Sequence, residues 1–161
     1  MYLGWLRKRL EGARTGQGHS PVVVCIHVTK AERHGMATFW AVVAGGGFGS
    51  GLRYLVAGSL QKQMSSGFPL GTLTVNLVGC LLIGLLATWF SGALEVREQV
   101  RVAILVGVLG GFTTFSSFGL ETVSLVQRGQ WGSAMLYVAV SNIVGFVAVW
   151  AGIRMVSGSV A

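Results

Sequence analysis

Four long apolar stretches follow one another along the chain, and short polar segments separate them. They cover residues 37–57, 69–90, 100–126 and 131–155, and the third is the longest. Each reaches the roughly 20 residues that an α-helix needs to cross the hydrocarbon core of a bilayer. The pattern therefore predicts an all-α membrane protein with four transmembrane helices. Because the connections are short, successive helices are expected to be antiparallel neighbours.

The third stretch carries the segment "GGFTTFSSF", residues 110–118, near its midpoint. Glycine weakens a helix, and hydroxyl groups offer the backbone alternative hydrogen bonds. In lipid, a break is tolerated only where protein, water or an ion satisfies the freed backbone groups. One interpretation is a third helix broken at mid-membrane, and the other is an ordinary helix–helix contact. The crowding of glycines, hydroxyls and aromatic rings into one short segment favours the break.

Glycines also gather in the first stretch, as "GGGFGSG". No window in it matches the phosphate-binding pattern G-x-G-x-x-G, and no strand is expected before it. Gly45 and Gly49 are four residues apart, as are Gly47 and Gly51. Small residues at this spacing let membrane helices approach closely, so the sequence predicts packing here.

The first 35 residues differ from the rest of the chain. They hold six of the twelve Lys and Arg residues and all three histidines. Their one apolar run, "PVVVCIHV", is too short for a secretory signal and contains a histidine. Two interpretations stay open: a mobile cytoplasmic tail, or sequence upstream of a true start at Met36. The predicted organisation is a leader over 1–35, a four-helix transmembrane domain over 36–157 and a tail over 158–161.

The charges support a membrane protein and bear on its orientation. Only 11% of residues are charged, against about a quarter in soluble proteins. The basic residues form no stripe with interleaved aromatics, which argues against a nucleic-acid partner. Beyond the leader, three positive residues fall on each side of the membrane: Arg97, Arg101 and Arg154 on one, Arg53, Lys62 and Arg128 on the other. A chain starting at Met36 therefore has no orientation bias, and an antiparallel dimer becomes reasonable.

Residues for enzyme catalysis are missing from the transmembrane domain. It contains no histidine and no aspartate, so acid–base chemistry and side-chain metal ligation lack candidates, and no enzyme is predicted. Polar residues of another kind occur at mid-helix: Asn76 in the second stretch, and Tyr137 and Ser141 on one face of the fourth, which Gly145 continues. Together they indicate a polar line without full negative charge, as an anion pathway requires.

Three motifs in this order, "GGGFGSGLRY", "FPLGTLTVNLVG" and "GGFTTFSSFGLE", resemble the Fluc fluoride channels, also called CrcB. The resemblance covers residue 36 to about residue 157. It implies an antiparallel, dual-topology homodimer in the bacterial inner membrane that exports cytoplasmic fluoride passively and confers fluoride resistance.

The resemblance also implies roles for particular residues. The backbone carbonyls of Gly110 and Thr113 would hold a central structural sodium ion. The fluoride pathway would consist of Phe115, Phe118, Asn76, Ser116, Ser117, Tyr137 and Ser141. Arg53 and Glu121 would serve a vestibule or gating, and Gly145 stands where some family members have a serine.

Two rival functions are weighed against this one. A small four-helix drug or cation exporter needs an acidic residue in its first membrane helix, and residues 36–60 contain none. A structural membrane subunit would explain the many small residues but not the polar cluster at mid-membrane.

Overall fold

The structure is a computed structural model that describes residues 35–62, 67–92 and 96–157. Within these ranges the chain forms helices and no strand, as the sequence predicts. The elements are α2 (Gly35–Lys62), α3 (Leu70–Gly92), α4 (Glu98–Val102), the π-helix η1 (Ala103–Val108), α5 (Leu109–Phe112), α6 (Phe115–Gln127) and α7 (Trp131–Ser157). Nearly all of the predicted leader and the whole tail over 158–161 lie outside the described residues.

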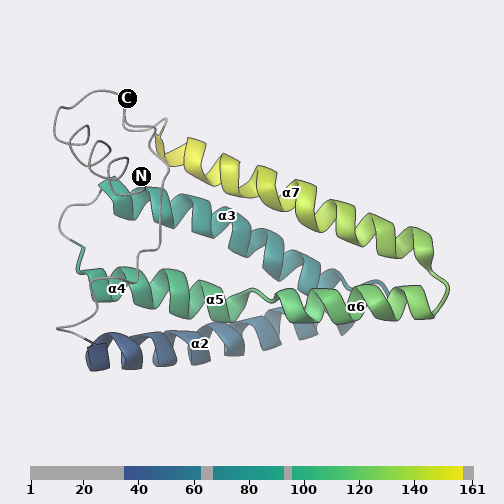
Figure 1. Cartoon of the computed structure of the whole chain (residues 1–161), viewed down its shortest axis with the longest axis horizontal. Coiled ribbons are helices and arrows are strands. Elements are labelled where there is room, and N and C mark those ends of the chain that lie inside the picture. Colours follow the sequence, from purple (N-terminus) through teal and green to yellow (C-terminus); the bar gives the residue numbers. More distant parts are fainter. Residues whose placement is uncertain (1–34, 63–66, 93–95, 158–161) are drawn as a thin grey trace, which may run out of the picture.

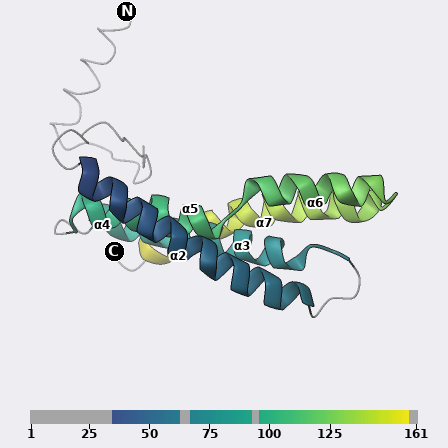
Figure 2. The same cartoon turned by 90° about the horizontal axis from the view of Figure 1, so that it is seen from below.

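The helices run up and down along one long axis (Figure 1). α2 and the series from α4 to α6 run in one direction, while α3 and α7 run in the other. α3 packs along α7, and α2 packs along η1 and α5. Figure 2 shows that α6 continues beside α7, whereas the carboxyl-terminal half of α2 diverges from α6.

The third predicted helix consists of several pieces. α4, η1 and α5 follow one another without a gap, and α5 ends at Phe112. Thr113 and Thr114 then have extended backbone angles, with ψ values of 158° and 118°. α6 begins at Phe115 and continues in the same general direction. Two residues therefore leave the helical conformation inside the "GGFTTFSSF" segment.

Close glycine contacts join α2 to η1 and α5. A Cβ atom on Gly49 would collide with the carbonyl oxygen of Val108, and one on Gly45 would lie 2.7 Å from that of Ala103. A Cβ atom on Gly111 would in turn collide with the carbonyl oxygen of Gly46. Such backbone approach is possible only without side chains, as the Gly45 and Gly49 spacing predicts.

The second predicted glycine pair behaves differently. A Cβ atom on Gly47 or on Gly51 would meet nothing within 4 Å in the described chain. These two glycines therefore do not mediate packing between the described helices of one chain. They lie on the face of α2 that points away from η1 and α5.

The turn between α6 and α7 is a Schellman motif. Gly129 has a φ of 74°, a left-handed conformation that favours glycine. Its N–H donates to the carbonyl oxygen of Val126, and the N–H of Gln130 donates to that of Leu125, both at 2.9 Å. The motif satisfies the last carbonyls of α6 and reverses the chain so that α7 returns along α3.

Three helical stretches of the described chain are long and apolar enough to cross a membrane: Leu70–Gly92, Glu98–Gln127 and Trp131–Ser157. α2 covers the first predicted span and has 28 residues, but it does not meet the same criterion. Its run of glycines and Ser50 replaces larger apolar side chains, which explains the difference. All four predicted spans are therefore helical, and three have the apolar character of a membrane helix.

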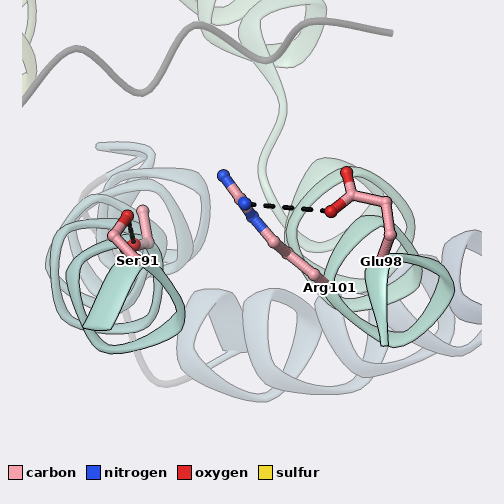
Figure 3. Close-up of polar contacts among 4 residues, drawn as sticks. Ser91, Glu98 and Arg101 are labelled. Carbon is pink, nitrogen blue, oxygen red and sulfur yellow. Dashed lines mark hydrogen bonds and ion pairs between the residues drawn. The ribbon is translucent and has the colours of Figure 1, made fainter. Parts of the chain in front are cut away.

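Polar contacts gather where α3 ends and α4 begins (Figure 3). Glu98 lies in the first turn of α4, where a negative charge is favoured by the helix dipole. Arg101 extends toward it, with 3.8 Å between Nη1 and Oε2. On α3 the Ser91 hydroxyl donates to the carbonyl of Ala87 at 2.7 Å. Exposed charges at this end fit a helix boundary at the membrane surface.

Large apolar side chains cover much of the remaining surface. Trp40, Phe48, Leu120 and Phe146 are all more than half exposed. A soluble monomer rarely leaves so much apolar surface in water. Within the described ranges, buried side chains form two small clusters, one around Leu125 and Tyr137 and one around Phe90, Leu105 and Leu109. The outer surface is built for lipid or for another protein.

Candidate ion-binding site at the junction of α5 and α6

The junction of α5 and α6 exposes backbone groups that a continuous helix would satisfy. A helix end leaves its last four carbonyls, and a helix start its first four N–H groups, without intrahelical partners. Thr114 caps the start of α6, since its Oγ1 accepts from the N–H of Ser117 at 3.2 Å. The same hydroxyl contacts the side chains of Ser116 at 3.2 Å and Ser117 at 3.1 Å.

Asn76 on α3 binds the backbone of Thr114 at both of its polar groups. Its Oδ1 accepts from the N–H of Thr114 at 2.8 Å, and its Nδ2 donates to the carbonyl of Thr114 at 3.0 Å. The amide side chain therefore replaces the two partners that a regular helix would have supplied. This pair fixes the extended residue against α3.

The carbonyl oxygens at the end of α5 fall into two groups. Leu109 accepts from the N–H and the hydroxyl of Thr113, each at 3.0 Å. Gly111 accepts from Nε of Arg53 at 3.1 Å and from the hydroxyl of Ser50 at 3.4 Å. In contrast, no hydrogen bond from the described residues reaches the carbonyl oxygens of Gly110, Phe112 and Thr113. Unpaired carbonyls of this kind are suitable ligands for a hard cation.

A cavity of about 320 Å³ lies beside the junction. The residues that line it include Asn76, Gly110, Thr113, Phe115, Phe118 and Ser141. The Oγ of Ser141 is buried and has no hydrogen-bond partner among the described residues. A buried hydroxyl without a partner costs free energy, so this atom marks a place for a ligand or water. No carboxylate is among the described residues that line the cavity.

Four aromatic rings form a column that starts at the cavity. The ring centroids of Phe115 and Phe118 are 5.5 Å apart, and those of Phe118 and Tyr137 are 5.1 Å apart. Phe68 follows at 5.6 Å from Tyr137 in an edge-to-face arrangement. Phe115 is 82% exposed in the single chain, so the column opens at the molecular surface. Ring edges carry partial positive charge that can face an anion.

Glu121 lies on α6, apart from the cavity, and its carboxylate is held by two hydroxyl groups. Thr72 donates to Oε1 and Tyr137 donates to Oε2, both at 2.7 Å. Tyr137 is completely buried, so its hydroxyl is fixed in this contact. The carboxylate oxygens therefore connect α3, α6 and α7 through short, charge-assisted hydrogen bonds.

The structure brings together most of the residues that the sequence singles out. Gly110, Thr113, Phe115, Phe118, Asn76 and Ser141 share the cavity, whereas Ser116 and Ser117 bond to the Thr114 cap and do not line it. Tyr137 bonds to Glu121 and is not among the lining residues. Gly145 is buried, and a Cβ atom there would lie 3.5 Å from Sγ of Cys80.

Arg53 lies near the end of the first predicted stretch, and the structure places it within α2. Its side chain bonds to the backbone of α5, since Nε donates to the carbonyl oxygen of Gly111 at 3.1 Å. The vestibule or gating role that the resemblance implies for Arg53 and the equal count of positive residues on the two sides stay predictions.

Sequence reasoning does not assign roles to three residues that the structure makes important. They are Thr114, which caps α6, Thr72, which holds Glu121, and Ser50, which bonds to Gly111. Thr72 is four residues before Asn76, so its position on the same face of α3 is a usable signal. Nothing local to the sequence indicates that Ser50 meets the end of α5.

A side-chain metal site does not explain the junction. Among the described residues no three His, Cys, Asp or Glu side chains come together. Backbone carbonyls, hydroxyls and the amide oxygen of Asn76 are the oxygen atoms that the described junction offers. The fold and the site thus define a small multi-pass α-helical membrane protein with a polar, aromatic-lined junction inside its third helical pass.

Comparisons with known proteins agree with this class. Residues 40–153 match the family described as CrcB-like protein, Camphor Resistance (CrcB). A protein of Caulobacter vibrioides is 46% identical over 113 residues, which cover 70% of this chain and 89% of the relative. One of Maridesulfovibrio salexigens is 38% identical over 120 residues, covering 74% and 95%. One of Agrobacterium fabrum is 45% identical over 114 residues, covering 71% and 91%.

Each of these three relatives bears the name "Fluoride-specific ion channel FluC". The matched region includes every described residue of the junction, of the cavity and of the Glu121 contacts. The chain belongs to the CrcB family.

Proposed function

We propose that this chain forms a fluoride-selective channel that lets the anion leave the cytoplasm passively through a bacterial inner membrane. The observation that carries the proposal is the cavity beside the junction, where the side chains of Phe115 and Phe118 and the unpartnered hydroxyl of Ser141 come together, with no carboxylate among the described residues that line it. Such a lining can replace the water around a small anion with weakly positive groups. The names of the relatives support fluoride as that anion.

In the proposed pathway, the ring edges of Phe115 and Phe118 face the anion, and the hydroxyl of Ser141 donates a hydrogen bond to it. Phe115 is exposed, and the cavity is open to the surface of the single chain. Ser116, Ser117 and Tyr137 are proposed to extend the polar line beyond the cavity, and Glu121 to terminate it. Asn76 contributes by holding Thr114, since both of its amide groups are engaged there.

The functional unit is proposed to be an antiparallel homodimer. Large apolar side chains are exposed over much of the described chain, and Phe115, which lines the cavity, has one of the most exposed rings. A second copy would cover this surface and complete the wall of the pathway. Positive residues occur at both ends of the helices, which leaves both orientations accessible to the described part of the chain.

A structural sodium ion is proposed at the centre of that dimer, with the carbonyls of Gly110 and Thr113 as ligands from each chain. The hydrogen bonding at the junction supports this choice of ligands. The carbonyls of Gly110 and Thr113 receive no hydrogen bond from the described residues, whereas those of Leu109 and Gly111 do. A bound sodium ion would supply positive charge that compensates the carbonyl dipoles where α5 ends.

The pathway is tested with purified protein in liposomes, by measuring fluoride efflux with an electrode. Phe115→Ile and Phe118→Ile keep apolar volume but remove the ring edges, so efflux should slow at least tenfold in one or both. Phe39→Ile, at the distant start of α2, is the matched control and should export at the wild-type rate. Wild-type efflux in both ring variants would remove these rings from the mechanism.

A further inference from the structure

Arg53 makes a contact that its expected place in a vestibule does not explain. Its Nε donates to the carbonyl oxygen of Gly111 at 3.1 Å, across 58 positions of sequence. Ser50, nearly one helical turn earlier on α2, donates to the same oxygen at 3.4 Å. Within the described residues Arg53 forms no ion pair, so this carbonyl is the polar partner of its guanidinium.

The contact depends on the glycine packing between α2 and α5. Gly49 lies against Val108, and Gly111 lies against Gly46, with no space for side chains at either glycine. This close approach brings the backbone of α5 within reach of a side chain on α2. Arg53 is half-buried there, so its position is set by packing and not by solvent.

The carbonyl that Arg53 binds lies between the two carbonyls that are proposed to bind the cation. Gly111 directly follows Gly110 and stands two residues before Thr113, and the carbonyls of these two neighbours receive no hydrogen bond from the residues that the structure describes. Successive carbonyls near a helix end point along the axis and compete for the same bound cation. Two donors from α2 remove the Gly111 oxygen from that competition and hold the end of α5 in one conformation.

We propose that Arg53 is a positioning residue for the cation site: it holds the Gly111 carbonyl against α2, so that the carbonyls of Gly110 and Thr113 stay directed to the cation. This inference rests on the sodium site of the proposed function. A guanidinium beside the carboxyl end of a helix is favoured by the helix dipole, whereas it would repel a nearby cation. Its contribution to cation binding is therefore geometric, through the hydrogen bond, and not electrostatic.

The test is the sodium dependence of the dimer formed by the full chain. Purified protein in detergent is stripped of sodium, and dimer fraction is then measured by cross-linking as NaCl replaces choline chloride at constant ionic strength. The wild-type dimer should form with a defined sodium midpoint. In Arg53→Met the midpoint should rise by roughly tenfold, the effect expected from losing one hydrogen bond to a charged donor. Arg53→Gln, which keeps N–H donors, should fall between the two.

Arg128→Met is the matched control, because Nε of Arg128 also bonds to a carbonyl, but to that of Ser124 in its own helix. Its sodium midpoint should equal the wild-type value. Should Arg53→Met not fold, Ser50→Ala removes the other donor to the same oxygen and should shift the midpoint in the same direction.

Three results would overturn the inference about Arg53. A wild-type midpoint in Arg53→Met, or in both Arg53→Gln and Ser50→Ala, overturns the inference and leaves the sodium site standing. A smaller dimer fraction at saturating sodium with an unchanged midpoint also overturns it, since that pattern shows a merely structural role. If the wild-type dimer itself does not respond to sodium, the sodium site of the proposed function fails instead, and the inference fails with it.

Discussion

The side chain of Asn76 and the backbone of Thr114 form a closed pair of hydrogen bonds, 2.8 Å and 3.0 Å long, between α3 and the junction of α5 and α6. A peptide group without a partner in lipid costs several kcal/mol. One amide side chain supplies both an acceptor and a donor in the correct arrangement. The extended conformation of Thr114 therefore depends on a residue 38 positions earlier in the chain.

Replacing Asn76 with alanine should destabilise the folded protein by about 1–3 kcal/mol, because it leaves two part-buried backbone groups of Thr114 unpaired. The measurement is the unfolding free energy in mixed detergent, from a titration with denaturing detergent. Asn142→Ala is the control, since among the described residues Nδ2 of Asn142 bonds within its own helix, to the carbonyl of Val138 at 2.7 Å. Equal stability losses in the two variants would contradict this account of the junction.

The glycines of α2 should differ sharply in their tolerance of alanine. Gly49→Ala places a methyl group against the carbonyl of Val108, so it should separate α2 from α5 and destabilise the protein by about 1–3 kcal/mol. Gly47→Ala meets nothing within the chain and should leave the stability of the monomer fold unchanged or slightly higher. Thermal unfolding in detergent compares the two, and an equal response at both positions would speak against the glycine packing described above.

Glu121 should be energetically coupled to its two hydroxyl donors. Tyr137→Phe removes one charge-assisted hydrogen bond and should cost about 1.5–3 kcal/mol of stability. After Glu121→Gln the carboxylate charge is gone, so the same Tyr137→Phe substitution should cost clearly less. A double-mutant cycle on unfolding free energies measures the difference. Additive effects would show that the 2.7 Å contact is not a strong interaction.

The sequence predicts much of this architecture for clear physical reasons. Apolar stretches of bilayer length predict α3, the third helical pass and α7. The short connection after the third stretch predicts an antiparallel return, and the turn with Gly129, two residues after the end of α6, provides it. The grouping of Asn76, Phe115, Phe118 and Ser141 also follows from helical spacing once the helices are antiparallel neighbours.

Other features depend on long-range contacts that a local pattern does not encode. The sequence shows Gly45 and Gly47 as equivalent members of glycine pairs, yet only the first faces another helix. The sequence shows Arg53 as a charge near the end of an apolar stretch, but its bond to Gly111 arises only from the packing of α2 on α5. The sequence does not predict the contact partner of a residue where that partner depends on how each helix is rotated about its own axis.

Anion transport by the purified full-length chain tests the central claim most directly. Liposomes are loaded with equal concentrations of potassium fluoride and potassium chloride, valinomycin is added to carry the compensating potassium, and the release of each anion is followed with its own electrode. The account predicts rapid release of fluoride while chloride stays inside, as in protein-free liposomes. Release of chloride as fast as fluoride, or release of neither anion, would contradict it.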